Sequence, residues 1–158
     1  MPLSLHIIYA STSGNTEYVV DTLTTFLREQ SPDLKIEVQR AERAESLDLL
    51  RGDAVILGSG TWNTGGTEGQ LNPHMYALLL ERAADADLHG KPLAFVSLGD
   101  DRYYFTTRCT EHFQRFLRTH NGKQLLPPLV IVNEPYGQEE KIHKWGKKLL
   151  SSLTLSLP

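Results

Sequence analysis

Short apolar runs alternate along the chain with longer segments in which apolar residues recur every three or four positions. The runs are rich in β-branched residues and predict strands at residues 5–10, 35–39, 54–59, 92–98 and 129–133. The segments between them predict helices at residues 16–30, 46–50, 107–119 and 138–152, and one more that begins at Pro73. Strands that alternate with helices form a parallel sheet covered on both faces. The pattern therefore predicts an α/β fold with a five-stranded parallel sheet.

Length and charge narrow the class of protein. With 158 residues and no repeat or linker in the alternation, the chain is predicted to form a single domain over residues 1–158. A net charge of −3 without a basic stripe argues against nucleic acid as a partner. No apolar stretch approaches the roughly 20 residues that a membrane span needs, and the first residues lack the basic region of a signal peptide. The single cysteine, Cys109, fits a reducing compartment, so we expect a cytoplasmic protein.

Three connections follow the carboxyl ends of predicted strands, at residues 10–16, 59–72 and 98–107. In a parallel sheet, ligands bind beyond these ends, at the point where the strand order reverses. All three connections are rich in glycine, serine, threonine, asparagine or aromatic residues. We therefore expect them, named here the first, second and third loop, to form the binding site.

The first loop has the composition of an anion site. It joins a strand to a helix that begins near Thr16, where free N–H groups and the helix dipole favour negative charge. A helix cap needs one small polar residue, whereas this loop has six in succession. It contains neither GxxxxGK[ST] nor GxGxxG, which argues against an NTPase P-loop and a dinucleotide fold. The side chains that can donate hydrogen bonds are Ser11, Thr12, Ser13, Asn15 and Thr16, and Gly14 allows close approach.

Trp62 is the strongest candidate for contact with a flat ring. A lone tryptophan more often packs in a core, but Trp62 lies among glycines and small polar residues, outside any apolar period.

Other candidate sites are weaker. The six histidines are scattered, and Cys109 and His112 lack a second pair of metal ligands. The chain has no GxSxG motif of a hydrolase.

The three loops together resemble those of flavodoxins. Residues 11–17 (STSGNTE) resemble the loop that holds the 5′-phosphate of FMN without a cationic side chain. Residues 60–66 (GTWNTGG) resemble the Thr-Trp-Asn-x-Gly segment, and residues 99–105 (GDDRYYF) resemble the Gly-Asp-x-x-Tyr segment. The resemblance covers essentially the whole chain and has no long insertion, as in the short-chain type. It implies a flavodoxin-like three-layer sandwich with a parallel sheet in the order 2-1-3-4-5.

The resemblance also implies which residues bind FMN. Trp62 would cover one face of the isoalloxazine ring, and the carbonyl of Asn63 would meet N5. Tyr103 has the shorter of two family spacings and Tyr104 the longer, so the tyrosine that stacks on the outer face stays open between them, with Tyr103 favoured. Cys109 is interpreted as a helix residue without a redox role. The complete implied set is Ser11, Thr12, Ser13, Gly14, Asn15, Thr16, Gly60, Thr61, Trp62, Asn63, Thr64, Gly65, Leu98, Gly99, Asp100, Tyr103, Tyr104 and Phe105.

The function implied by the resemblance is that of a low-potential electron carrier, not an enzyme. Noncovalently bound FMN would cycle between semiquinone and hydroquinone and shuttle electrons between redox partner proteins, a reductase and an acceptor. We expect a monomer that binds neither metal nor membrane. Two alternatives share the fold, namely an NAD(P)H:quinone reductase and an activator of one dedicated metalloenzyme. A third is a module that has lost flavin and keeps only the anion site.

Overall fold

The structure is a computed structural model that describes residues 3–62, 64–66, 68–101 and 108–156. Its centre is a parallel sheet in the order β2-β1-β3-β5, and β6 and β7 both pair with β5 at the far edge. The predicted order 2-1-3-4-5 is confirmed, and the fifth position is divided between two short strands. The strands are β1 (Ser4–Tyr9), β2 (Lys35–Arg40), β3 (Ala54–Trp62), β5 (Pro92–Gly99), β6 (Lys123–Gln124) and β7 (Leu129–Val132).

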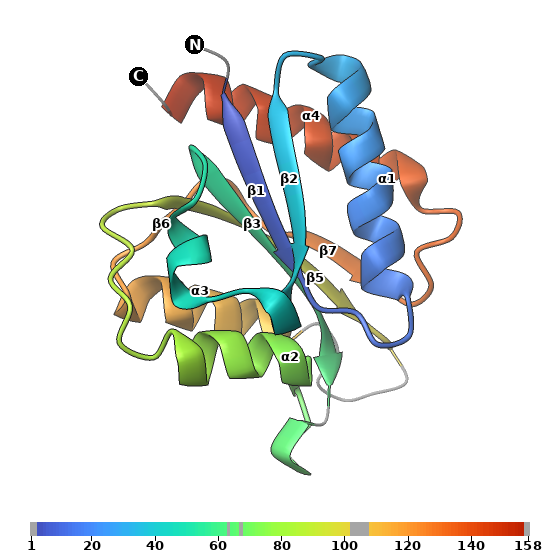
Figure 1. Cartoon of the computed structure of the whole chain (residues 1–158). Coiled ribbons are helices and arrows are strands. Elements are labelled where there is room, and N and C mark those ends of the chain that lie inside the picture. The colour runs from blue at the N-terminus through green and yellow to red at the C-terminus, as the bar shows by residue number, and fades with distance from the viewer. Residues whose placement is uncertain (1–2, 63, 67, 102–107, 157–158) are drawn as a thin grey trace.

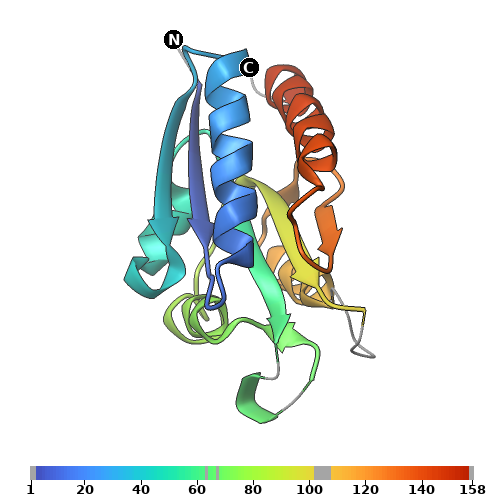
Figure 2. The same cartoon turned by 90° about the vertical axis from the view of Figure 1, so that its right-hand side faces the viewer.

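Helices cover both faces of the sheet and complete the predicted three layers (Figure 1). Helices α1 (Asn15–Gln30) and α4 (Glu139–Ser156) lie side by side on one face, as Figure 2 also shows. The other face is covered by α3 (Cys109–Thr119) and by α2 (Pro73–Tyr76) with its continuation η4 (Ala77–Arg82). The short turns are η1 (Ala41–Arg43), η2 (Ser46–Leu50) and η3 (Thr64–Gly66).

The core lies on both sides of the sheet because the inner strands β1, β3 and β5 are apolar on both faces. In β1, Leu5 and Ile7 pack against α1 and α4, whereas Ile8 packs against the layer of α2 and α3. Successive side chains of a strand point to opposite faces, so one apolar run contributes to two cores. This is why the strands appear in the sequence as continuous apolar runs.

Several boundaries differ from the sequence expectation by one to four residues, and two of them, at the binding edge of the sheet, have a local cause. Strand β3 continues beyond the predicted residue 59 to Trp62, because its end pairs with the antiparallel β4 (Gln70–Leu71). Strand β7 ends at Val132, before the predicted residue 133, since Asn133 adopts a positive φ of 68° that a strand cannot continue.

The register of the strands brings the three loops to one edge. Tyr9 pairs with Gly58, and Gly60 pairs with Leu98, so β1, β3 and β5 end close together. Among the described residues, none of the helices combines the length and apolarity required to cross a bilayer.

Candidate functional site

The first loop is held in shape by the side chain of its first residue. Ser11 Oγ accepts hydrogen bonds from the N–H groups of Gly14 and Glu17, both at 3.2 Å. Gly14 has a φ of 95°, which glycine adopts without strain, and it precedes helix α1 directly. Because Ser11 Oγ already accepts two bonds, the hydroxyl proton is its remaining hydrogen-bonding capacity.

The Thr12 hydroxyl, like that of Ser11, accepts a hydrogen bond from the protein, here from a residue of the second loop. Asn72 is fully buried, and its Nδ2 donates to Thr12 Oγ1 at 3.0 Å, while its Oδ1 accepts the N–H of His74 and caps α2. The backbone N–H of Asn72 donates to Ser59 Oγ at 3.0 Å. Thr12, like Ser11, therefore acts as an acceptor toward the protein and retains a proton that it can donate outward.

The start of α1 adds backbone donors to these hydroxyls. Among the described residues, the N–H groups of Asn15 and Thr16 have no hydrogen-bond partner. The first N–H groups of a helix have no partner within the helix, and they carry the positive end of its dipole. Hydroxyl protons and helical N–H groups thus meet at the first loop, which is an arrangement for binding an anion.

Two glycines of β3 make room for the helix and for the indole of Trp62. A Cβ on Gly58 would lie 3.5 Å from Thr16 Cγ2, and a Cβ on Gly60 would lie 3.0 Å from Trp62 Nε1 and 3.9 Å from Thr16 Oγ1. The indole N–H is therefore folded back above Gly60, on the side where Thr16 lies. The position of the indole depends on Gly60, because a Cβ there would push the indole away.

Arg40, at the end of β2, reaches the first loop from the side of the sheet. Its Nη2 donates to the carbonyl of Ser11 at 2.7 Å, and its Nη1 donates to Glu17 Oε2 at 2.6 Å. Its Nε donates to Glu42 at 2.9 Å. The hydrogen bond to Glu42 raises the pKa of the Arg40 guanidinium most. The charges of Tyr9 and Glu42 and the hydrogen bond to Glu17 add to it and outweigh burial, so Arg40 stays charged.

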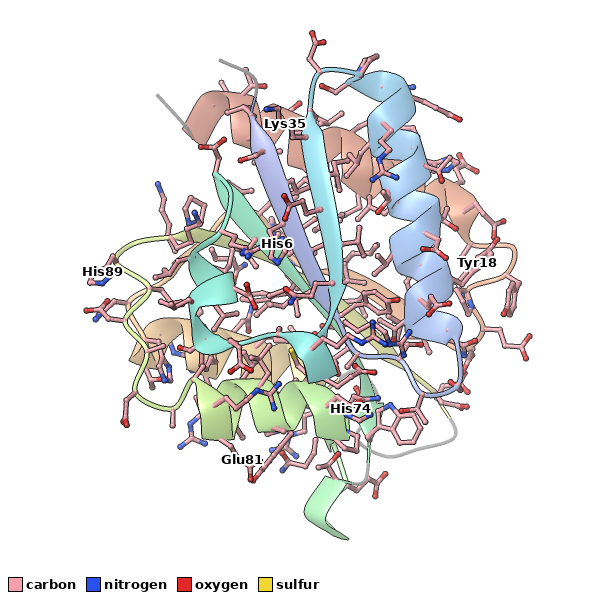
Figure 3. The ribbon with its side chains drawn as sticks, viewed as in Figure 1. His6, Tyr18, Lys35, His74, Glu81 and His89 are labelled. Carbon is pink, nitrogen blue, oxygen red and sulfur yellow. The ribbon has the colours of Figure 1, made fainter. Side chains whose placement is uncertain are left out.

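His74, at the start of α2, lies at the same end of the sheet (Figure 3). Burial of the Glu42 carboxyl opposes its ionisation, but hydrogen bonds from the backbone and from Arg40, together with the charges of Arg40 and His74, lower its pKa. Glu42 is therefore ionised at neutral pH beside the Arg40 guanidinium.

The second loop returns to the sheet through β4 and is fastened at three points. Thr61 and Trp62 pair with Leu71 and Gln70, and Thr64 Oγ1 donates to the carbonyl of Leu71 at 2.5 Å. From α3, His112 Nε2 lies 2.8 Å from the carbonyl of Gly69. These contacts fix the ends of the loop that carries Trp62.

The second and third loops are joined beneath the surface by Thr61 and Cys109. Thr61 Oγ1 donates to the carbonyl of Leu98 at 2.9 Å and lies 3.4 Å from the N–H of Cys109. The Cys109 thiol is fully buried and donates to the carbonyl of Ser59 at 3.4 Å. Burial raises the pKa of this thiol. The thiol is therefore buried and protonated, and the absence of a redox role for Cys109 stays a prediction.

The start of the third loop is tied to the end of β7. The N–H of Asn133 donates to the carbonyl of Gly99 at 2.7 Å, and the N–H of Asp101 donates to Asn133 Oδ1 at 3.0 Å. Asn133 Nδ2 also donates to Asp101 Oδ2 at 3.0 Å. One asparagine in the left-handed region thus fixes how the chain leaves β5.

The structure brings most of the predicted site residues to this edge of the sheet. Ser11 to Thr16 form the first loop and the start of α1, Gly60 to Trp62 end β3, and Leu98 and Gly99 end β5. Thr64 and Gly65 lie in η3, and Asp100 follows β5. Contact of these residues with a cofactor stays a prediction. The predictions for Asn63, Tyr103, Tyr104 and Phe105 lie outside the described residues.

Three residues of the site were not singled out from the sequence, namely Arg40, Asn72 and Asn133. Asn72 stands directly before a proline at the start of a helix, which is a recognisable cap signal. Asn133 follows an apolar strand, where asparagine often adopts a positive φ. Arg40 gives no such signal, because its partner is distant in the sequence.

The described residues fit the phosphate end of FMN. Its phosphate needs hydrogen-bond donors, and Ser11, Thr12 and the start of α1 provide them. Its flat ring needs an aromatic surface beside that anion, and both Trp62 Nε1 and Thr16 Oγ1 lie within 3.9 Å of the position that a Cβ on Gly60 would take. Among the described residues, no cluster of three or more His, Cys, Asp or Glu side chains could hold a metal ion.

Comparisons with known proteins agree with this geometry. The chain is 28% identical over 141 residues to a probable flavodoxin 2 of Bacillus subtilis (strain 168), which covers 85% of each chain. The crystal structure of oxidised flavodoxin 2 from Bacillus cereus superposes with a TM-score of 0.80 at 26% identity, over 98% of this chain and 99% of that one.

A mutant flavodoxin from Fusobacterium nucleatum, bound to flavin mononucleotide, shares the fold with a TM-score of 0.76 at 15% identity, over 100% of this chain and 99% of that one. The family model for flavodoxin matches residues 7–145. The chain therefore belongs to the flavodoxin family, whose members bind FMN, and its length is that of the short-chain type.

Proposed function

We propose that this protein binds FMN noncovalently at the three loops and passes single electrons between a reductase and an acceptor protein. The observation that carries the proposal is the state of two hydroxyl groups. Ser11 and Thr12 accept hydrogen bonds from their own protein, so each has a proton left to donate to a phosphate oxygen. The fold and the family support an FMN-binding electron carrier in general terms.

Each loop has a separate task in this proposal. Ser11, Thr12, Ser13 and the N–H groups of Asn15 and Thr16 hold the phosphate. Trp62 stacks on one face of the ring, and Tyr103 or Tyr104 on the other. The backbone at Asn63, Thr64 and Gly65 meets the ring near N5, and Leu98, Gly99 and Asp100 meet its pyrimidine edge. Thr61 and Phe105 complete the walls of the slot.

FMN supplies one-electron chemistry, and the protein sets its potential by its surroundings. The slot proposed between Trp62 and the third loop would exclude water and oppose extra negative charge on the ring. The nearby phosphate opposes it further, since no lysine belongs to the first loop. Each 1.4 kcal/mol of such opposition lowers a one-electron potential by about 60 mV. We infer that the carrier works between its one-electron-reduced and fully reduced states.

The first test is a titration of the purified protein with FMN and with riboflavin, followed by stepwise reduction with dithionite. We expect tight FMN binding, weaker riboflavin binding and reduction in two resolved one-electron steps. Colourless protein without affinity for FMN would overturn the proposal. Direct oxidation of NAD(P)H with a quinone acceptor, in the absence of any reductase, would show an enzyme in place of a carrier.

The role of the hydroxyl groups is tested by Thr12→Val, which keeps the shape of the side chain and removes the donor. A hydrogen bond to a charged group contributes about 1.5–3 kcal/mol, so FMN affinity should fall about 10- to 100-fold. Riboflavin, which lacks the phosphate, should bind as before. Thr25→Val is the matched control, because Thr25 is exposed in the second half of α1. Equal losses for FMN and riboflavin would contradict phosphate binding by Thr12.

A further inference from the structure

Arg40 occupies a position that its sequence context does not explain. Nη2 donates to the Ser11 carbonyl, and Nη1 lies 2.6 Å from Glu17 and 3.2 Å from Tyr9 Oη. The guanidinium carbon lies 5.2 Å from the centre of the Tyr9 ring, and Tyr9 Oη donates to Glu17 at 3.1 Å. Arg40 is thus locked between a strand, a loop and the first turn of a helix.

Glu17 presents an electrostatic problem for an anion site. It lies in the first turn of α1, and its own N–H is bound by Ser11 Oγ, the hydroxyl that holds the loop together. A carboxylate at a helix N-terminus stabilises the helix, but an unpaired one would repel a phosphate dianion bound at that same turn. The partner of Glu17 is Arg40. The side chain of Arg40 is 32% exposed and that of Glu17 is 44% exposed, so solvent screens the pair incompletely.

The contact with the Ser11 carbonyl has a second consequence. In a trans peptide, the carbonyl oxygen and the following N–H point in opposite directions. Because the carbonyl of Ser11 points at Arg40, the N–H of Thr12 points away from Arg40. Arg40 thereby draws the negative end of this peptide toward itself and turns the positive end to the opposite side of the loop.

We propose that Arg40 is a specificity-determining residue for the phosphate group: it cancels the charge of Glu17 and fixes the orientation of the Ser11–Thr12 peptide without touching the ligand. This inference rests on the proposed function, because it assumes that the phosphate of FMN lies at the first loop. It adds a cation to a loop that contains none of its own. Glu42 also pairs with Arg40, so Arg40, Glu17 and Glu42 sum to −1, and loss of Arg40 would leave −2.

The decisive experiment measures dissociation constants for FMN and for riboflavin in wild type, in Arg40→Gln and in the double variant Arg40→Gln/Glu17→Gln. We expect Arg40→Gln to weaken FMN about tenfold at low salt and to change riboflavin less than about twofold. The double variant should recover most of the FMN affinity, because it removes the carboxylate that Arg40 neutralises. Added salt should reduce the effect of Arg40→Gln.

Arg28→Gln is the matched control, since Arg28 lies in the last turn of α1 and donates to the carbonyl of Ile36. It should leave both dissociation constants unchanged. If Arg40→Gln does not fold, Glu42→Gln tests the same idea in the opposite direction, because it lets Arg40 neutralise Glu17 more fully. FMN should then bind about two- to fivefold more tightly.

The outcomes separate this inference from the proposed function. If the wild type does not bind FMN, the proposed function itself fails. If the wild type binds FMN but Arg40→Gln weakens FMN and riboflavin equally, Arg40 is only a structural residue and the inference is overturned. A double variant as weak as Arg40→Gln would overturn the part that concerns Glu17.

Discussion

The two ends of the sheet satisfy their polar groups with different chemistry. At the amino end, charged side chains do so: the Asp53 carboxylate accepts the N–H of Ser4 at 2.8 Å, and the Lys91 ammonium donates to the carbonyls of Leu50 and Gly52. At the carboxyl end, most of this work is done by neutral side chains: Ser11, Ser59 and Asn72 hold the backbone of the first and second loops. Arg40 adds a charged donor there, to the carbonyl of Ser11.

This difference explains why only one end is suited to a ligand. At the amino end, a carboxylate and an ammonium group make hydrogen bonds to the backbone, and each would repel a ligand of like charge. A hydroxyl that accepts two bonds from the protein still has a proton to donate. Its lone pairs hold the loop in shape, and its proton can bind a ligand. The first loop can therefore keep its shape before a ligand arrives.

The largest effect is expected for Asn72→Ala at the carboxyl end. The substitution leaves the N–H of His74 and the hydroxyl of Thr12 without a buried partner and removes the cap of α2. The free energy of unfolding should fall by about 2–3 kcal/mol, and FMN affinity should fall with it. Urea denaturation and FMN titration measure the two effects.

Asp53→Ala is the comparison at the amino end, where Asp53 is exposed. It should cost less than about 1 kcal/mol and leave FMN binding intact. A larger loss of stability for Asp53→Ala than for Asn72→Ala would show that the ionic end, and not the neutral one, holds the sheet.

Two glycine substitutions should separate stability from binding. A Cβ on Gly122 would lie 2.7 Å from Leu117 Cδ1 and 2.8 Å from Leu88 Cδ1, and both leucines are buried in the core under α3. Gly122→Ala should therefore lower the free energy of unfolding by about 1–3 kcal/mol without affecting FMN. Thermal unfolding of the flavin-free protein gives the first quantity.

Gly60→Ala should lower the affinity for FMN and change the free energy of unfolding little. The added methyl group displaces the indole of Trp62, which is half-buried and can turn outward at a small cost in stability. FMN affinity should fall by roughly tenfold, as expected when a stacking aromatic residue is misplaced. Unchanged affinity would mean that Trp62 does not contact the ring.

The smallest effect concerns the pH dependence of stability at a contact between α1 and α4. Tyr18, labelled in Figure 3, donates to Glu139 at 2.7 Å. This hydrogen bond, with one from the N–H of Gly137, lowers the pKa of Glu139 below its ordinary value in the folded state. A lowered pKa means a stabilisation that is present above the unfolded pKa and is lost as the pH falls through the folded value.

Tyr18→Phe should therefore lower the free energy of unfolding near pH 7 and reduce its decline between neutral pH and the acid range. Denaturation at several pH values measures both. The double variant Tyr18→Phe/Glu139→Gln is the control and should decline still less with acid, because it also removes the contribution of the Gly137 N–H to the lowered pKa of Glu139. If the free energy of unfolding falls as steeply with acid in Tyr18→Phe as in the wild type, the decline comes from other carboxylates.

The fold was predictable from the sequence because the long strands and helices each have a local pattern. The continuous apolar runs of β1, β3 and β5 indicate burial on both faces, and the structure places them in the predicted order. The two short strands were not predicted. Gln70–Leu71 and Lys123–Gln124 contain too few residues for a period, and pairing with β3 and β5 alone makes them strands.

The sequence alone determined the fold class, the three loops and the hydroxyl-rich composition of the first loop, because these depend on residues that are neighbours in the chain. Only the tertiary structure decided what surrounds that loop. Asn72 reaches Thr12 across 60 positions of the chain, and Arg40 reaches Ser11 across 29. The physical reason is the register of the sheet: Tyr9 pairs with Arg40, so the guanidinium at the end of β2 lies beside the loop that leaves β1.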